Sequence, residues 1–179
     1  VSMVTGMFQM IGSFRDTIEE WFDVRFQADL YVSESGVTGA GSLNGIDPEV
    51  MRDLLKDPNI EYADIMRICY AKPDQGVTVL AGVDMMHWSE KARQIWLKKP
   101  GELQVVDGAE SALVSETFAR RFDVLDGGVV EIETPSGKKK ISPLGIFCDY
   151  GNEFGMAAID QKQWIRWVGT DRPINASLY

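Results

Sequence analysis

The first 27 residues constrain the fold of this chain more than any other segment. Apolar side chains recur there at steps of three and four, which is the spacing of one face of an α-helix. The members of this stripe are Met3, Met7, Ile11, Phe14, Ile18, Trp21 and Phe22. Charged side chains fill the other faces only from Arg15 onward, whereas residues 1–12 carry no charge and are apolar on nearly all sides. The pattern predicts one helix over residues 2–27, about 35–40 Å long.

This gradient from apolar to amphipathic is typical of a helix that leaves a bilayer and then docks on a soluble body. We expect residues 1–27 to be a stalk helix, the end of a removed transmembrane segment. Met3, Met7, Ile11 and Phe14 are the candidate residues for contacts within the stalk or with a partner. The alternative is an ordinary core helix. The segment lacks the positive n-region and cleavage pattern of a signal peptide, and no stretch reaches the roughly 20 apolar residues of a membrane span.

The rest of the chain alternates short strand and helix patterns, which predicts an α+β fold with mixed sheets in two lobes. A glycine-rich loop is expected over residues 34–45, without the lysine and strand–loop–helix order of a phosphate loop. One helix is expected to begin at Asp84, to carry Ile95 and Trp96 on its apolar face, and to end at Pro100. The other predicted helices cover 47–55, 116–122 and 160–168, and the predicted strands cover 28–33, 60–71, 76–83, 111–115, 129–134, 138–148, 155–159 and 173–179.

Composition excludes several classes of partner. The 179 residues contain 18 Lys and Arg against 27 Asp and Glu, a net charge of −9, and 45% hydrophobic residues. A globular, acidic chain without a basic block is a poor ligand for nucleic acid, because phosphate binding depends on clustered Lys and Arg. The single basic run, residues 138–140, follows a turn signal and is expected to be a solvated hairpin edge.

No catalytic or metal-binding constellation emerges from the sequence. Cys69 and Cys148 match no zinc or redox spacing, so they are two buried small hydrophobes or, in an oxidising compartment, a disulfide. His87 is the only histidine and cannot build a multi-histidine site. Ser115 lacks the flanking glycines of a nucleophile elbow and is expected to cap a helix. We therefore expect no cofactor and no bound metal.

The densest polar cluster is residues 148–153. Its carboxylates, Asp149 and Glu153, are candidates for an acid–base pair or for ligands of a hard cation. The alternative is a polar connection between two strands.

Several ordered motifs resemble the extracytoplasmic domain of FtsX-like (MacB-type) ABC-transporter permeases. The predicted helix runs into Gln-Ala-Asp-Leu-Tyr-Val-Ser at 27–33, and Ala-Leu-Val-Ser-Glu-Thr-Phe-Ala-Arg-Arg follows at 112–121. A Pro-Ser-Gly turn, Leu-Gly-Ile-Phe-Cys-Asp-Tyr at 144–150 and Phe-Gly-Met-Ala-Ala-Ile-Asp at 154–160 complete the series. The likeness covers essentially the whole chain, although the turn before Val129 departs from the glycine pattern of the family.

The resemblance implies a porter-like βαβ lobe, about residues 28–83 and 160–179, and a small inserted α/β lobe, about residues 84–159. It implies an inner-membrane protein whose domain faces the periplasm, a second permease copy in the membrane, and a separate cytoplasmic ATP-binding subunit, so that the domain itself is not an enzyme. The expected cargo or partner is a lipoprotein, lipid, peptide or envelope protein. Two alternatives stay open: a free-standing periplasmic binding or adaptor module, and a cation-assisted exported hydrolase that uses Asp149 and Glu153.

Overall fold

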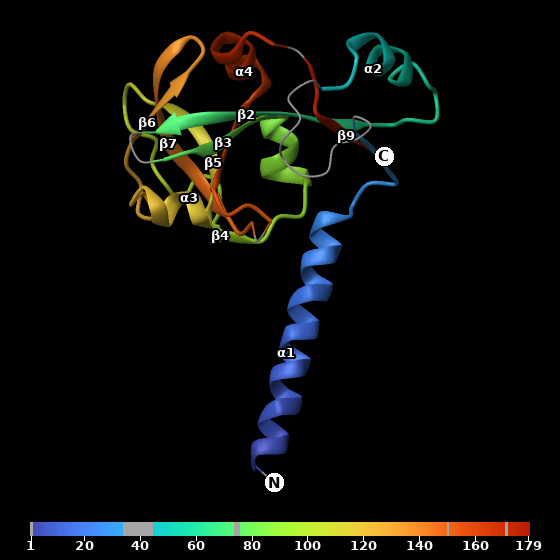
Figure 1. The fold of residues 1–179 in the computed structure, drawn as a ribbon, viewed down its shortest axis with the longest axis vertical. Coiled ribbons are helices and arrows are strands. Elements are labelled where there is room, and N and C mark those ends of the chain that lie inside the picture. Colours follow the sequence, from blue (N-terminus) through green and yellow to red (C-terminus); the bar gives the residue numbers. More distant parts are fainter. Residues whose placement is uncertain (1, 34–44, 74–75, 150, 171) are drawn as a thin grey trace.

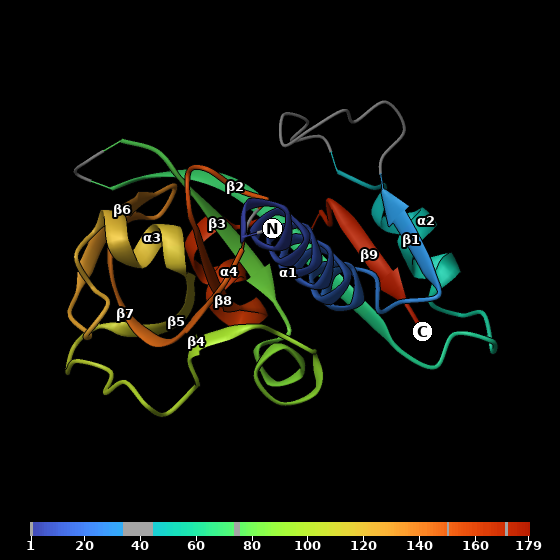
Figure 2. The ribbon, with the colours of Figure 1, turned by 90° about the horizontal axis from the view of Figure 1, so that it is seen from below.

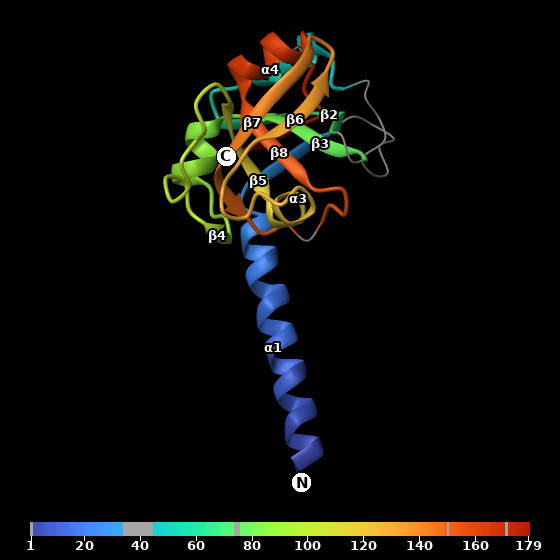
Figure 3. The ribbon, with the colours of Figure 1, turned by 90° about the vertical axis from the view of Figure 1, so that its left-hand side faces the viewer.

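The long N-terminal helix projects away from the rest of the chain (Figure 1). The computed structural model describes residues 2–33, 45–73, 76–149, 151–170 and 172–179. Helix α1, Ser2–Arg25, is 24 residues long and descends from one side of a folded body. We call the described residues from 26 onward the body. Helix α4, Gln161–Val168, lies on the side of the body opposite α1 (Figure 3).

The body is built on one mixed sheet, which confirms the predicted α+β class. Its strand order is β1-β9-β2-β3-β8-β5-β7-β4, with β6 paired to β2 and β7. The pairs β3–β8 and β5–β7 are parallel, and the other pairs are antiparallel. The strands are β1 Leu30–Ser33, β2 Ala63–Pro73, β3 Thr78–Val83, β4 Trp96–Lys98, β5 Glu110–Ser115, β6 Val130–Thr134, β7 Gly137–Phe147, β8 Met156–Asp160 and β9 Asn175–Leu178.

Six of these strands close into a ring, because β6 bridges the two ends of the path β2-β3-β8-β5-β7. Each strand of the ring contributes residues to the largest core cluster, with Leu80, Val114 and Ile132 fully buried. Helix α3, Glu116–Arg121, adds Phe118, and α4 adds Trp164. The period of two along a strand places Val130 and Ile132 of β6 on the inward face, in this core.

A separate core lies around β1, β9 and the first half of β2. Helix α2, Pro48–Leu54, covers it with Met51, which packs with Ile46, Ala176 and Leu178. Asp47 accepts a hydrogen bond from Glu49 N at 2.7 Å, which confirms the predicted start of this helix. The predicted loop over residues 34–45 lies outside the described residues apart from Gly45.

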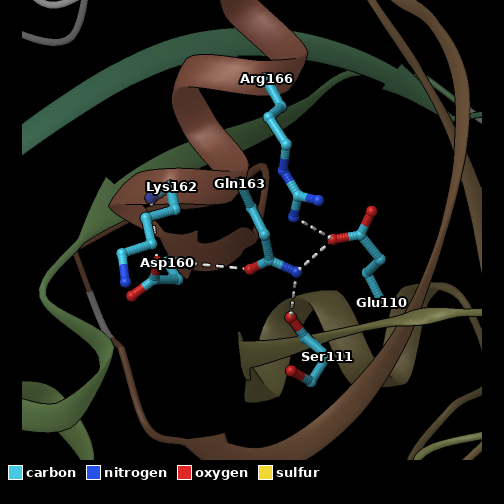
Figure 4. A network of polar contacts seen from close by, with 6 residues as sticks. All are labelled: Glu110, Ser111, Asp160, Lys162, Gln163 and Arg166. Atoms are coloured by element: carbon cyan, nitrogen blue, oxygen red, sulfur yellow. Dashed lines mark hydrogen bonds and ion pairs between the residues drawn. The ribbon is translucent and has the colours of Figure 1, made fainter.

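A capping box fixes the start of α4 and a polar network joins this helix to β5 (Figure 4). Asp160 N donates to the side chain of Gln163 at 3.0 Å, and Asp160 Oδ1 accepts from Lys162 N at 2.9 Å, as the sequence predicts. Gln163 Nε2 donates to Glu110 Oε2 at 2.8 Å, and Arg166 donates to the same oxygen at 3.0 Å. The network therefore holds Trp164 and Trp167 over the ring.

The helix predicted from Asp84 to Pro100 is wrong beyond its first turns. Asp84 Oδ1 caps the segment as expected, accepting from Met86 N and His87 N at 3.1 Å. The helical turns end with the π-helical residues His87–Lys91, and Ala92 is already extended. Trp96 instead begins strand β4 and pairs with Phe147 of β7. Pairing with β7, a distant part of the chain, is thus more favourable here than the helix that the local pattern predicts.

Candidate functional site

Helix α1 is exposed along its length. Among its residues whose burial is described, Gly12 is half-buried and all the others are exposed. Met3 is 81% exposed, Met7 54%, Ile11 56% and Phe14 67%, so the four predicted contact residues lie on an open surface. Val4, Phe8 and Met10 are also exposed, which confirms that the first third is apolar on several faces. The reading of α1 as a core helix is therefore wrong. Among the described residues, no helix combines the length and apolar character of a membrane span.

Exposure of this kind predicts that the apolar side chains of α1 are dispensable for the fold of the body. The double substitution Met3→Ser and Met7→Ser is expected to change Tm by less than about 2 °C, because neither side chain loses buried area. A thermal melt followed by near-ultraviolet circular dichroism measures this. Met51→Ser is the matched control, since Met51 is only 4% exposed, and it is expected to lower Tm clearly. A comparable loss in the double variant would place Met3 and Met7 in a core.

A side-chain amide ties the foot of α1 to the segment before β4. Gln27 Nε2 donates to Arg93 O at 2.9 Å, and Gln27 Oε1 accepts from Arg93 N at 2.9 Å. The two bonds use both the donor and the acceptor of one amide, so they fix its orientation as well as its distance. Arg93 follows the helical turn that Asp84 caps and precedes β4, so Gln27 links the foot of α1 directly to this part of the body.

The other side of the foot is tied to the edge of the sheet. The rings of Phe22 and Phe26 stack at 5.5 Å, and Phe26 meets Tyr31 of β1 edge to face at 5.9 Å. Asp29 N donates to Leu178 O at 3.0 Å, at the end of β9. Because β1 and β9 are antiparallel, the end of β9 lies beside the start of β1. The C-terminal residue Tyr179 thus lies near the point where α1 joins the body (Figure 1).

A cleft of about 270 Å³ lies between these two attachments. Its walls come from the foot of α1, from β2 and β9, from the segment before β4, and from β7 and β8. In the view from below, α1 crosses in front of the sheet between β9 and β3 (Figure 2). The cleft has five aromatic lining residues, Phe26, Tyr31, Trp88, Phe147 and Tyr179. Among the described residues, the only charged side chains that line the cleft are those of Asp64 and Asp149.

Asp64 is the most unusual group in the cleft. Its Oδ2 accepts a hydrogen bond from Trp88 Nε1 at 3.0 Å, while its Oδ1 is buried and has no hydrogen-bond partner among the described residues. Burial raises the pKa of this carboxyl above its usual range, against the smaller lowering effects of the Trp88 bond and His87. A buried carboxylate with one unsatisfied oxygen is costly to keep charged.

Three aromatic side chains, Tyr62, His87 and Tyr179, cluster near Asp64. Tyr62 stacks on His87 with ring centroids 4.5 Å apart, and Tyr179 lies 5.9 Å from both rings. The Tyr62 hydroxyl donates to Asp84 Oδ2 at 3.1 Å. Desolvation, with the nearby Asp64 and Asp84 charges, raises the pKa of Tyr62, so its hydroxyl stays protonated as a donor.

The raised pKa of Asp64 makes the stability of the body depend on pH. Below the ordinary carboxyl value of 3.8 the side chain is protonated in the folded and unfolded states, and no penalty arises. As the pH rises from 3.8 through the higher pKa that Asp64 has in the folded state, the side chain ionises more readily in the unfolded state, so the free energy of unfolding falls. Asp64→Asn keeps an acceptor for Trp88 and is expected to raise Tm at about pH 7 by a few degrees, with a gain that shrinks toward zero in acid.

Thermal melts of the wild-type and variant chains across this pH range measure the effect. Asp126→Asn is the contrasting control, because the bond from Lys98 lowers the pKa of Asp126 and its removal gives no gain at neutral pH. A loss of stability in Asp64→Asn at neutral pH would show that the Asp64 carboxylate is favourably paired.

The residues singled out from the sequence are distributed as follows. Asp149 lines the cleft and accepts from Gly151 N at 2.9 Å, whereas Glu153 is exposed and does not line it. Within the described ranges, no group of three His, Cys, Asp or Glu side chains could hold a metal ion. The structure thus does not bring Asp149 and Glu153 together with a third ligand in the cleft, as the hydrolase hypothesis requires.

The surroundings of Ser115, Cys69 and Cys148 point to structural roles and not to catalysis. Ser115 Oγ accepts from Phe118 N at 3.2 Å and from Met156 N at 2.9 Å, which confirms its role as a helix cap. Cys69 and Cys148, both within the described residues, are thiols and not a disulfide. Burial raises the pKa of the Cys69 thiol to about 11, which makes it a poor nucleophile at neutral pH.

Sequence reasoning missed Gln27 and Asp64 as members of the site. Asp64 carried a usable signal, since it shares the face of one strand with Met66 and Ile68, and all three line the cleft. A carboxylate at an inward position of an apolar strand marks a site candidate. Gln27 carried no such signal, because its partner Arg93 lies 66 residues away and is held through backbone atoms.

Comparisons with known proteins agree with this architecture. No protein-family model matches the chain. Among curated proteins, it is similar to the uncharacterized ABC transporter permease protein Rv0987 of Mycobacterium tuberculosis, with 25% identity over 177 residues that cover 96% of this chain. The chain spans about a fifth of the length of that relative, since the match covers 21% of it.

Two solved structures share the fold. The extracellular domain of the noncanonic ABC-type transporter YknZ from Gram-positive bacteria superposes with a TM-score of 0.52 and 13% identity, over 84% of this chain and 80% of that chain. The periplasmic region of MacB from Actinobacillus actinomycetemcomitans gives a TM-score of 0.50 and 9% identity, over 83% of this chain and 72% of that chain. The predicted resemblance to the extracytoplasmic domain of FtsX-like (MacB-type) permeases is confirmed.

Proposed function

We propose that this chain is the extracytoplasmic domain of an ABC-transporter permease, and that α1 transmits motion from the membrane to the body. The observation that carries the proposal is α1 itself. It is a 24-residue helix that lies outside the body, exposes apolar side chains along its length, and is tied to the body at its foot. Apolar area of this size on a helix needs a cover, which neighbouring membrane-proximal helices would supply.

The place where α1 leaves the body supports this placement. It lies next to the end of β9, so a chain that continued beyond residue 179 would start on the same side of the body as α1. The relative Rv0987, named an ABC transporter permease, is about five times as long as this chain, so a protein of that size has room for membrane segments outside the matched part. The body would then face the extracytoplasmic side, above the inner membrane.

Transmission follows from the attachments of α1. Helix–helix packing has discrete arrangements, so a shift between two such states at the membrane tilts a rigid helix as a unit. The Gln27–Arg93 pair would pass that tilt to the segment before β4, and the Asp29–Leu178 bond would pass it to the edge of the sheet. The ring of β2, β3, β8, β5, β7 and β6 spans both proposed lobes, about residues 28–83 with 160–179 and about residues 84–159, so it would follow that tilt as one unit.

The proposed partners are a cytoplasmic ATP-binding subunit and a second permease copy in the membrane. ATP hydrolysis would take place on the ATP-binding subunit, and the domain itself would act as a mechanical and binding module. Cargo or envelope partners of the lipoprotein, lipid, peptide or protein class would meet the body on the extracytoplasmic side.

Orientation and partnership are tested together in the intact protein. Arg52 is exposed on α2, so Arg52→Cys in an intact protein from which all other cysteines have been removed offers one labelling site. A membrane-impermeant maleimide is expected to label this site in intact cells, and an affinity tag on the permease is expected to co-purify an ABC ATPase. Leu113→Cys, at a fully buried position, is the unlabelled control. Labelling only after lysis, or purification without an ATPase, would contradict the proposal and favour a free-standing binding module or another topology.

A further inference from the structure

We propose that the cleft at the foot of α1 binds a small organic cation, a protonated amine carried on an apolar body. The site goes beyond the proposed function and does not depend on it, because the cleft is formed by the chain alone. Its volume of about 270 Å³ suits a compact ligand with an amine and a short apolar chain.

The charges of the cleft select a cation. Its charged lining residues within the described part of the chain, Asp64 and Asp149, are both acidic. Asp64 offers the main attachment, because its Oδ1 is buried and lacks a hydrogen-bond partner among the described residues. An ammonium group there supplies both the opposite charge and the donors that the carboxylate lacks. It also compensates the burial that raises the pKa of Asp64.

The neutral walls of the cleft favour an organic cation over a metal ion. Five aromatic rings line it, contributed by Phe26, Tyr31, Trp88, Phe147 and Tyr179. Aromatic faces attract ammonium groups and bury apolar chains, whereas a hard cation requires several oxygen ligands. No cluster of three potential metal-ligating side chains exists within the described ranges. Met66, Ile68 and Met156 add an apolar floor for the ligand body.

The groups around Asp64 provide a local readout. The Trp88 indole donates to Asp64 Oδ2 at 3.0 Å, so an ammonium that reaches the carboxylate competes with or polarises this bond. His87, Asp84, Tyr62 and Tyr179 are the other charged or titratable groups that interact with Asp64. Binding is therefore expected to shift the indole N–H resonance of Trp88 in a nuclear magnetic resonance titration.

The test compares three probes that share one apolar chain: octylammonium, octanol and octanoate. Isothermal titration calorimetry of the 179-residue chain is performed below the concentrations at which the probes form micelles. We expect octylammonium to bind at least about tenfold more tightly than octanol, and octanoate to bind most weakly. We expect only octylammonium to give a large shift of the Trp88 indole signal.

Variants then assign the effect to the cleft. Asp64→Asn is expected to weaken octylammonium about tenfold and to leave octanol unchanged, and Asp149→Asn to give a smaller loss in the same direction. Glu153→Gln removes an equal charge from an exposed position outside the cleft and is expected to change nothing. Equal affinities for octylammonium and octanol, no binding of octylammonium, or full affinity in folded Asp64→Asn and Asp149→Asn would each overturn the proposal. None of these results bears on the membrane orientation or the ATPase, which are tested separately.

Discussion

Trp164→Ala is expected to lower the free energy of unfolding of the body by about 3–5 kcal/mol. Trp164 is 1% exposed, packs in the largest core cluster, and donates from its indole to Thr170 O at 2.9 Å. A Cβ at Gly82 of β3 would come within 2.7 Å of its ring, so the sheet is shaped closely around this side chain. Truncation leaves a cavity, and a closed ring of strands cannot move inward to fill it.

Chemical denaturation followed by circular dichroism measures this loss, and Ile165→Ala is the matched control on the same helix. Ile165 is 54% exposed, so its truncation is expected to cost less than about 1 kcal/mol. A loss of under about 1 kcal/mol in Trp164→Ala would show that α4 does not pack over the ring in solution.

Gln27→Ala is expected to speed hydrogen exchange of the Arg93 amide by about tenfold, because it removes the acceptor of that amide. The bond from Arg93 N to Gln27 Oε1 measures 2.9 Å in a segment without regular secondary structure. Exchange at Leu113 of β5, buried within the sheet, should remain unchanged. Residue-resolved exchange by nuclear magnetic resonance measures both amides in one sample.

Gln94→Ala is the matched control for this experiment. Gln94 neighbours Arg93 and lines the same cleft, but the bonds that reach the stalk come from Gln27. If the Arg93 amide exchanges equally fast in the wild type and in Gln27→Ala, the foot of α1 is not attached to this segment. Motion of α1 would then reach the body only through the edge of the sheet, at β1 and the end of β9.

Much of the fold could be predicted from local patterns. Asp47, Ser115 and Asp160 mark helix starts through hydrogen bonds within a few residues, so their signals are complete in the sequence. The stripe of α1 is equally local, and its apolar first third indicated correctly that the helix is not covered by its own chain. The alternation along β6 placed its inward residues for the same reason.

The rest depends on contacts between distant segments. Residues 92–96 have a helical pattern, yet Cys148 N bonds to Ile95 O at 2.8 Å and Gln27 holds Arg93. The closure of the ring by β6 rests on a short pairing with the end of β2, which no periodicity reveals. The cleft combines residues from 26 to 179, so its acidic, aromatic character exists only once the chain is folded.

The motion transmission proposed for α1 is tested most directly by a distance measurement in the intact protein. Spin labels at Glu20 of α1 and Asp107 of the body, both exposed, report the angle between stalk and body by double electron–electron resonance. Transmission through α1 predicts that the distance distribution shifts by several ångströms between nucleotide-free and ATP-bound states. Thr17→Pro, which interrupts α1 and removes an internal hydrogen bond, should abolish the shift, whereas Thr17→Ala should preserve it. Identical distributions in the two nucleotide states of an active transporter would contradict the account.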